Sequence, residues 1–245
     1  MKLNIALFLT IVTNLFSGCE YFSCNEVNQT SNQIGMLPEE DRKYILKSVI
    51  IKMKSAKQIL GSDIESTIYF DDYGDKFCNI TETKLKYKGT TIVTTSINIT
   101  RNDYTYTYNP EKLNGTKSKN KGNINAMHVD FASMDAQSLE SNGIRKGGNT
   151  EWLGRECEVF ILDNPALEMV GRYEVWNKIP LKFATKIGSS EMEMYAVEIS
   201  ENTEIPTSVF ELPANVEFID ASNLLTSSTE PALSDSLLNL PASDK

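Results

Sequence analysis

Residues that could carry catalysis are few. The chain of 245 residues has one histidine, His128, and four cysteines. A single imidazole cannot form a two-histidine metal site, and a Ser-His-Asp arrangement would depend on His128 alone, with no nucleophile-elbow glycine motif beside it. We therefore interpret His128 as a structural residue. The sequence predicts no catalytic residue, no metal ligand set and no cofactor, and so no enzyme.

Two further segments have a composition that can bind ions. Asp71, Asp72 and Asp75 surround Gly74, but their spacing does not match the EF-hand loop, and hairpin turns select Asp and Gly. The glycines of residues 143–148 lie beside basic side chains without the G-x-G-x-x-G spacing of a phosphate-binding loop. We predict a turn at the first segment and a helix-to-strand loop at the second.

The N-terminus carries a modification signal. An apolar stretch from Leu3 to Phe16 follows Lys2, and as a helix it would measure about 21 Å, shorter than the roughly 30 Å hydrocarbon core of a bilayer. This length is typical of a secretory signal peptide. Ser17 and Gly18 before Cys19 resemble the bacterial lipobox, at which a lipoprotein signal peptidase cleaves and leaves an acylated cysteine. We predict a signal peptide over residues 1–18 and lipid attachment at Cys19.

Two alternatives to this site stay open. Cys24 is a rival cleavage point, although the bulky Tyr21 and Phe22 lie where small residues are needed. The other alternative is a secreted protein in which Cys19 is incidental. Acyl chains contribute about 0.8 kcal/mol for each buried CH₂ group, so lipidation predicts a membrane anchor. The expected location is the bacterial cell envelope, on the outer membrane.

Charge is distributed unevenly along the chain. Residues 1–122 hold 16 basic and 13 acidic side chains, whereas residues 123–245 hold 8 and 20, for a net charge of −9. A net-acidic chain repels nucleic acid phosphates. We therefore exclude nucleic acid as a partner.

Several small motifs add context. Sequons begin at Asn28, Asn79, Asn98 and Asn114, but they matter only in a eukaryotic secretory pathway, against which the lipobox argues. The segment 235–237 (Asp-Ser-Leu) resembles the O-glycosylation acceptor of Bacteroidetes envelope proteins.

Two cysteines fall in segments that resemble strands. Cys78 and Cys157 could pair in an oxidising envelope, or both could be free buried thiols. The sequence leaves these two alternatives open.

Most of the chain has the period of a β-strand. Thr81, Thr83, Leu85 and Tyr87 alternate strictly with charged residues, which indicates a half-buried antiparallel strand. The same pattern and composition predict strands near residues 45–53, 64–70, 92–99, 104–108, 156–162, 171–176, 181–186, 191–199 and 216–219.

One helix is expected between the two runs of strands. Ser133 is the predicted N-cap of a short helix through Leu139, which ends at Asn142 and Gly143. No linker divides residues 41–220, so we predict a single domain there. A polar tether over residues 19–40 precedes it. A low-complexity tail over 221–245 follows, either disordered or holding a short amphipathic helix with Leu233, Leu237 and Leu240 on one face.

Five segments, in this order, resemble the DUF4412 type of bacterial envelope protein, which is similar to the LolA/LolB lipoprotein-carrier superfamily. The segments are Ile68–Gly74, Tyr104–Tyr106, Gly154–Val159, Val175–Lys182 and Ile205–Pro213. The resemblance implies a mainly β fold, an incomplete antiparallel β-barrel (the LolA-like half-barrel) with short helices in its concave side. It also implies a concavity that holds acyl chains.

From the fold we expect a lipoprotein that binds an apolar or acylated ligand, such as an acyl chain or a lipoprotein, without catalysis. The aromatic and aliphatic strand positions expected to line its cavity are Tyr69, Leu85, Tyr87, Tyr106, Tyr108, Trp176, Leu181 and Phe183. The alternative for each of these residues is that its side chain packs in the hydrophobic core. A second class, an envelope sensor or structural module with a filled cavity, acts through protein contacts. A third class, an envelope hydrolase, is not supported by any residues of the sequence.

Overall fold

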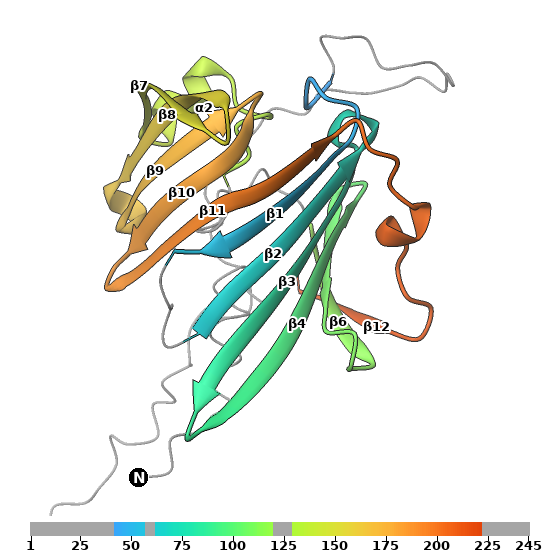
Figure 1. The fold of residues 1–245 in the computed structure, drawn as a ribbon. Coiled ribbons are helices and arrows are strands. Elements are labelled where there is room, and N and C mark those ends of the chain that lie inside the picture. The colour runs from blue at the N-terminus through green and yellow to red at the C-terminus, as the bar shows by residue number, and fades with distance from the viewer. Residues whose placement is uncertain (1–41, 57–61, 120–128, 222–245) are drawn as a thin grey trace, which may run out of the picture.

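The computed structural model describes residues 42–56, 62–119 and 129–221, which form one sheet of twelve strands (Figure 1). In chain order the strands are β1 (Val49–Ser55), β2 (Ser62–Asp71), β3 (Lys76–Tyr87), β4 (Thr90–Arg101), β5 (Tyr104–Tyr108), β6 (Asn114–Lys119), β7 (Ile144–Trp152), β8 (Arg155–Asn164), β9 (Met169–Trp176), β10 (Ile179–Ile187), β11 (Ser190–Glu201) and β12 (Glu217–Asp220). The helical elements are α2 (Ala136–Ser141) and three 3-10 turns, η2 (Asp72–Gly74), η3 (Pro165–Leu167) and η4 (Thr207–Phe210).

The sheet joins two meanders. Its order is β12-β6-β5-β4-β3-β2-β1-β11-β10-β9-β8-β7, so β1 pairs with β11 where the two runs of hairpins meet. Every pair is antiparallel except β6 with β12, which is parallel. The all-antiparallel sheet expected from the sequence is corrected at this one edge, because β12 arrives from the far end of the chain instead of from a hairpin.

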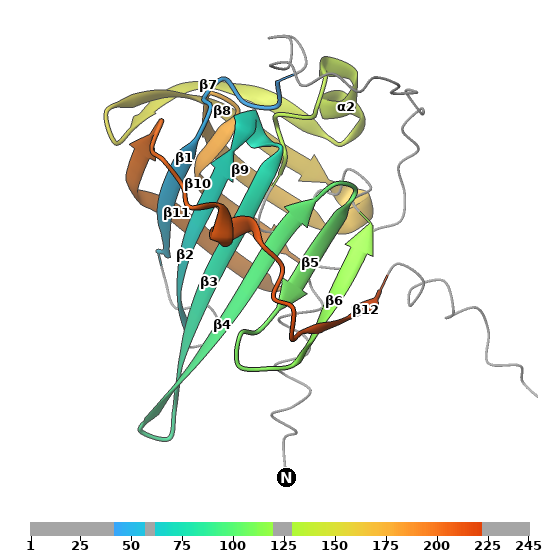
Figure 2. The same cartoon turned by 90° about the vertical axis from the view of Figure 1, so that its right-hand side faces the viewer.

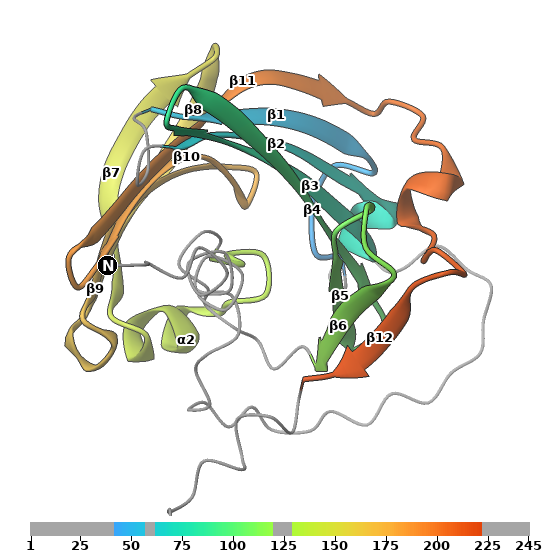
Figure 3. The same cartoon turned by 90° about the horizontal axis from the view of Figure 1, so that it is seen from below.

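The sheet curls into an open barrel. Seen from below, the strands follow an arc from β7 to β12, and α2 lies on its inner side (Figure 3). This confirms the predicted mainly β half-barrel with a short helix in its concave side. The face toward α2 is called the concave face below, and the other the convex face.

Turn chemistry explains the hairpins. At the tip of the β3–β4 hairpin, Lys88 and Gly89 have φ angles of 49° and 81°, as a two-residue turn with positive φ requires. Gly74 in η2 has a φ of 101°, and a Cβ there would lie 2.5 Å from the Tyr44 ring. The turn predicted at residues 71–75 is confirmed, and Asp72 forms an ion pair with Lys76 there.

The helix begins two residues later than predicted. Its N-cap is Asp135, whose Oδ1 accepts a hydrogen bond of 2.7 Å from the backbone N–H of Ser138. Ser133 instead donates its hydroxyl to the carbonyl of Asp130. The predicted end is confirmed: Gly143 has a φ of 72°, and a Cβ there would lie 2.2 Å from the carbonyl oxygen of Asp163.

Two strands were missed by the sequence prediction. Residues 143–148, predicted as a loop, mostly belong to β7, and β6 was not expected at all. A bulge between Lys146 and Asn149 breaks the register of β7, and its side chains from Arg145 to Asn149 are exposed. An exposed, bulged strand at a sheet edge has no apolar alternation to detect.

Some predictions fall outside the described residues. These are the segments 1–18 and 19–40 with Cys19 and Cys24, His128, and the helix proposed after residue 231. Among the described residues, no helix has the length and apolar character needed to cross a bilayer.

Candidate functional site: the concave face

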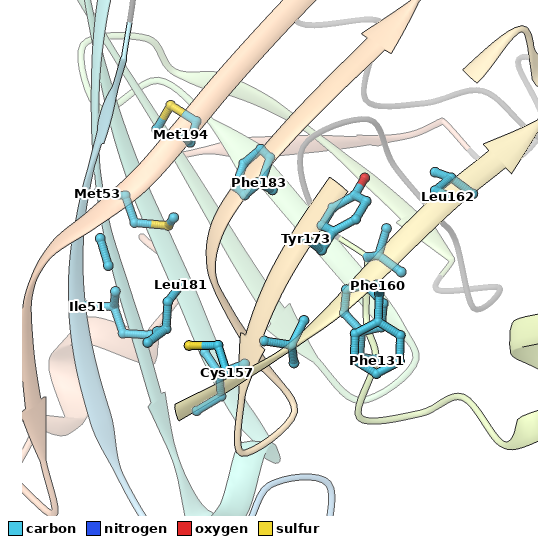
Figure 4. Close-up of a cluster of buried hydrophobic side chains, with 14 of the residues drawn as sticks. Ile51, Met53, Phe131, Cys157, Phe160, Leu162, Tyr173, Leu181, Phe183 and Met194 are labelled. Atoms are coloured by element: carbon cyan, nitrogen blue, oxygen red, sulfur yellow. The ribbon is translucent and has the colours of Figure 1, made fainter. Parts of the chain in front are cut away.

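One half of the concave face is a packed core. Side chains from β1 and β8–β11 meet there (Figure 4). Ile51, Leu181 and Tyr173 are completely buried, and Phe183 stacks on Tyr173 with ring centroids 6.0 Å apart. β1 and β10 alternate at these positions, so each contributes every second side chain to the cluster.

The segment before α2 covers this core. Phe131 lies between two rings, with its centroid 4.7 Å from Phe160 and 5.3 Å from Tyr173, and Val129 is completely buried (Figure 4). Leu139 of α2 packs against the same cluster. The concave face of β1 and β8–β11 is therefore filled by the protein's own side chains.

Polar contacts fix the core and its cover. The Tyr173 hydroxyl lies 3.0 Å from Thr185 Oγ1, and burial raises the pKa of Tyr173 to about 12. Lys43 forms an ion pair of 2.7 Å with Asp130, next to the cover. Tyr44 stacks on Phe70, and burial, with Asp130 nearby, raises its pKa well above the ordinary value.

The other half of the concave face, over β2–β5, has a different character. Register places Ser66, Thr81 and Ser96 in one row across β2, β3 and β4. The next row toward η2 holds Asn79 and Asn98 in the middle. These side chains are neutral, polar and mostly half-buried, so this part of the concave face is polar and not hydrophobic.

An apolar strip links the core to the end of the β3–β4 hairpin. Ile64 belongs to the buried cluster, and Leu85, one row further along, is half-buried opposite Ile92. Ile92 is 39% exposed and Tyr87 44% exposed. Neither β2 nor β5 extends as far along the sheet as Tyr87, so among the described residues this end of the β3–β4 hairpin has no further strand beside it (Figure 2). This end is called the open part of the concave face below.

The eight predicted lining residues do not share one surface. Leu85 and Tyr87 lie on the open part of the concave face. Leu181 and Phe183 lie in the packed core, which is the alternative to a cavity lining stated for these residues. Trp176 is half-buried, and the guanidinium carbon of Arg155 lies 5.0 Å above its ring.

Three predicted residues face the opposite way. Tyr69 opposes Cys78 across β2 and β3, and Tyr106 opposes Ile99 across β4 and β5, all at convex positions. Tyr108 shares that face. The expectation that these three tyrosines line the concavity is therefore wrong.

The C-terminal segment explains this inversion. Residues 202–216 run outside β2–β4, and β12 then pairs with β6 (Figure 2). Phe218 meets Tyr106 and Tyr108 edge to face, at 5.2 and 5.9 Å. These three rings are half-buried against one another on the convex face, and Ile205 in the same C-terminal segment is buried.

Both described cysteines are free and buried. Cys157 belongs to the main core, whereas Cys78 lies at a convex position outside it. Burial raises the pKa of the Cys78 thiol to about 12 and also raises that of Cys157. The alternative of two free thiols is the one that the structure supports.

Charged side chains gather on the convex face. Glu65 contacts Lys54 at 3.1 Å and Lys84 at 3.0 Å, and these hydrogen bonds lower the pKa of the Glu65 carboxyl. Within the described ranges, no group of three or more His, Cys, Asp and Glu side chains is placed to hold a metal.

The polar part of the concave face was not predicted from the sequence. Asn79 and Asn98 were considered only as sequons, and their neighbours on the face are serines and threonines. A signal was present, since Asn79 and Thr81 alternate with Cys78 and Ile80. Alternation alone does not reveal which of two half-buried faces is concave.

No protein-family model matches the sequence, and no curated protein matches it. Solved structures show weak similarity. An uncharacterized conserved protein from Thermus thermophilus has a TM-score of 0.46 at 9% identity, covering 74% of this chain and 93% of that one. PNGF-II has a TM-score of 0.42 at 10% identity, and the match covers 74% of this chain but only 32% of that one. A structure described as an outer membrane lipoprotein-sorting protein domain, from Vibrio parahaemolyticus, has a TM-score of 0.31 at 11% identity, with 66% and 88% covered.

Proposed function

We propose that this protein is a non-catalytic lipoprotein of the bacterial cell envelope, of the DUF4412 type and similar to LolA and LolB. Its half-barrel binds an apolar or acylated ligand on the open part of the concave face. The observation that carries the proposal is the apolar strip from Ile64 through Leu85 and Ile92 to Tyr87, which leaves the core and ends exposed. An acyl chain laid along it would remove those side chains from water.

The binding test uses a matched pair of substitutions on one hairpin. The full chain should bind a fluorescent fatty acid with micromolar affinity, about −8 kcal/mol. Leu85→Glu places a charge on the concave strip and should weaken binding at least tenfold. Val93→Glu places the same charge on the convex side of the hairpin, where Val93 is 50% exposed, and should leave binding unchanged.

Phe183 is unsuitable for this test because it is only 5% exposed within the core, and a buried charge there would unfold the protein. Equal loss of binding in the two glutamate variants, with both still folded, would contradict a ligand on the strip. If the folded wild-type chain binds none of the acylated probes, the proposal of acyl binding is wrong.

The envelope location rests on Ser17, Gly18 and Cys19. In a Gram-negative host, the wild-type chain should incorporate radioactive palmitate and fractionate with membranes. Cys19→Ser should abolish both. Labelling that survives in Cys19→Ser but disappears in Cys24→Ser would move the attachment site. Wild-type protein without label would contradict the lipoprotein assignment.

A second function is favoured by one observation. The concave face of β1 and β8–β11 is already filled by Phe131 and its neighbours, as in a structural or sensor module with a packed interior. Such a module would act through protein contacts. Fatty-acid titration separates the two functions, because only the binding module responds to the ligand.

A further inference from the structure

The concave face of β1–β5 is uncharged. Concave positions on β3 and β4 are occupied by Phe, Asn, Thr, Leu, Tyr, Ser and Ile, and those on β1, β2 and β5 by Val, Ile, Met, Ser, Phe and Thr. The lysines and glutamates of these strands, including Glu65, Glu82 and Lys84, occupy the convex face. A charged group brought onto the concave face would lose hydration without meeting an opposite charge.

Two carboxamides lie side by side at the middle of this face. Asn79 of β3 and Asn98 of β4 are directly opposed in the register, which places their Cβ atoms about 5 Å apart. They are called the amide pair below. A hydroxyl from each flanking strand contacts the pair: Ser66 donates to Asn79 Oδ1 at 2.5 Å, and Thr107 donates to Asn98 Oδ1 at 2.6 Å.

These contacts leave the donors of the amide pair available. Each Oδ1 is engaged from the side, and within the described part of the chain no acceptor is bound to either side-chain NH₂ group. Hydroxyls of Thr81 and Ser96 lie in the next row, and that of Thr94 lies in the row after it. The result is a set of neutral donors and acceptors at spacings set by the sheet, which suits a ligand with several uncharged oxygens.

We propose that the open concave face recognises a neutral glycolipid, with an uncharged sugar on the amide pair and its acyl chain on the strip toward Tyr87. The inference rests on the proposed acyl-binding function and names the class of head group. The NH₂ groups of Asn79 and Asn98 donate to sugar oxygens, and the adjacent hydroxyls accept from sugar hydroxyls. The polar rows and the apolar strip are continuous, since Thr83 and Leu85 follow Thr81 on β3.

The test compares three probes that share a twelve-carbon chain, each below its micelle concentration: dodecyl maltoside, dodecylphosphocholine and dodecanoate. The protein is the full chain with Cys19→Ser, so that no attached acyl chain competes. Calorimetry should show dodecyl maltoside binding about tenfold more tightly than either charged probe. Asn79→Leu with Asn98→Leu should remove that advantage and leave dodecanoate affinity unchanged.

Two further variants guard against misfolding and unspecific effects. Asn98→Asp keeps the shape of the side chain but replaces the donor with a charge, so it should weaken dodecyl maltoside binding at least fivefold. Thr95→Leu changes a convex position on the same strand and should have no effect.

The outcomes separate the two proposals. If dodecanoate binds and the sugar adds nothing, or if the Asn variants weaken all three probes equally, the glycolipid inference is wrong and acyl binding stands. If none of the probes binds to the folded chain, the proposed function and this inference both fail.

Discussion

The indole N–H of Trp152 donates a hydrogen bond of 2.9 Å to the backbone carbonyl of Ala196. Trp152 ends β7, the outermost strand of one meander, whereas Ala196 lies in β11, with three strands between them in the sheet. The Trp152 ring also meets Tyr195 edge to face at 5.8 Å, and Lys182 lies 5.0 Å above it. The β7–β8 hairpin therefore bends over the sheet, and Trp152 joins it to β11 together with the ion pair between Arg155 and Glu201.

Removing this contact should loosen the hairpin. Trp152→Phe keeps an aromatic ring but loses the hydrogen bond, and should lower the free energy of unfolding by about 1 kcal/mol. Trp152→Ala also loses the ring packing and should cost about 3 kcal/mol. Urea denaturation of both variants measures the difference. Equal costs for the two variants would show that the ring packing contributes nothing.

The cover over the packed half of the concave face gives a second prediction. Phe131→Ala removes a ring that is 6% exposed and contacts both Phe160 and Tyr173. The expected loss is about 3–4 kcal/mol in the free energy of unfolding, with stronger fluorescence of a bound hydrophobic dye. Phe131→Leu, which retains much of the volume, should lose less than half as much. A dye signal unchanged in Phe131→Ala would mean that the cover collapses onto the core.

Buried Tyr173 should make the protein sensitive to alkali. Its pKa is about 12 in the folded protein, against 10.0 ordinarily, because burial disfavours the phenolate. Folded protein holds this proton more tightly than the unfolded chain does. The contribution is therefore fully present below pH 10 and is lost as the pH rises toward 12, by about 2–3 kcal/mol.

Tyr173→Phe separates this titration from packing. The variant leaves the Thr185 hydroxyl without its tyrosine partner, so at pH 8 it should be about 1–2 kcal/mol less stable than the wild type. Between pH 10 and 12 its stability should fall less steeply, and the two curves should converge. Parallel curves over that range would rule out Tyr173 as the titrating group.

The free thiols should be unreactive in the folded state. With a pKa of about 12, Cys78 has a thiolate fraction of about one in ten thousand at pH 8, and Cys157 is also buried with a raised pKa. We expect an alkylating reagent to label neither residue until denaturant is added, as peptide mass spectrometry would show. Rapid labelling of Cys78 alone would indicate that residues 202–216 lift from the convex face.

The sequence predicts the strands better than it predicts the faces. Strict alternation at residues 81–87 located β3 because each side chain there has one consistent face. β6 and β7 were missed because they lie near or at the sheet edges and expose most of their side chains. The predicted N-cap of the helix was two residues too early, because Ser133 and Asp135 are both residue types that favour this position.

Which face of the sheet a side chain occupies depends on contacts with residues far away in the sequence. Tyr106 and Tyr108 were expected in the concavity because aromatic residues are usually buried inward. They lie half-buried on the convex face instead, against Phe218, more than a hundred residues later. No local pattern encodes that segment's path, so Tyr106 and Tyr108 were placed on the wrong face, whereas Leu85 and Tyr87 lie on the concave face.

The last prediction concerns the edge formed by that segment. Gly115 in β6 pairs with Tyr108 on one side and Phe218 on the other. A Cβ at Gly115 would lie 2.8 Å from the carbonyl oxygen of Thr107 and 2.9 Å from the Phe218 ring. Only glycine therefore lets the ring settle against the strand.

Gly115→Ala should displace Phe218 and release β12 from β6, with a cost of about 1–3 kcal/mol in the free energy of unfolding. Limited proteolysis should then cut within residues 202–221 under conditions that leave the wild type intact. Thr116→Ala, at an exposed position beside it, is the control and should behave like the wild type. If Gly115→Ala resists protease as well as the control does, the C-terminal segment is held by residues 202–210 and the aromatic contact at β6 is dispensable.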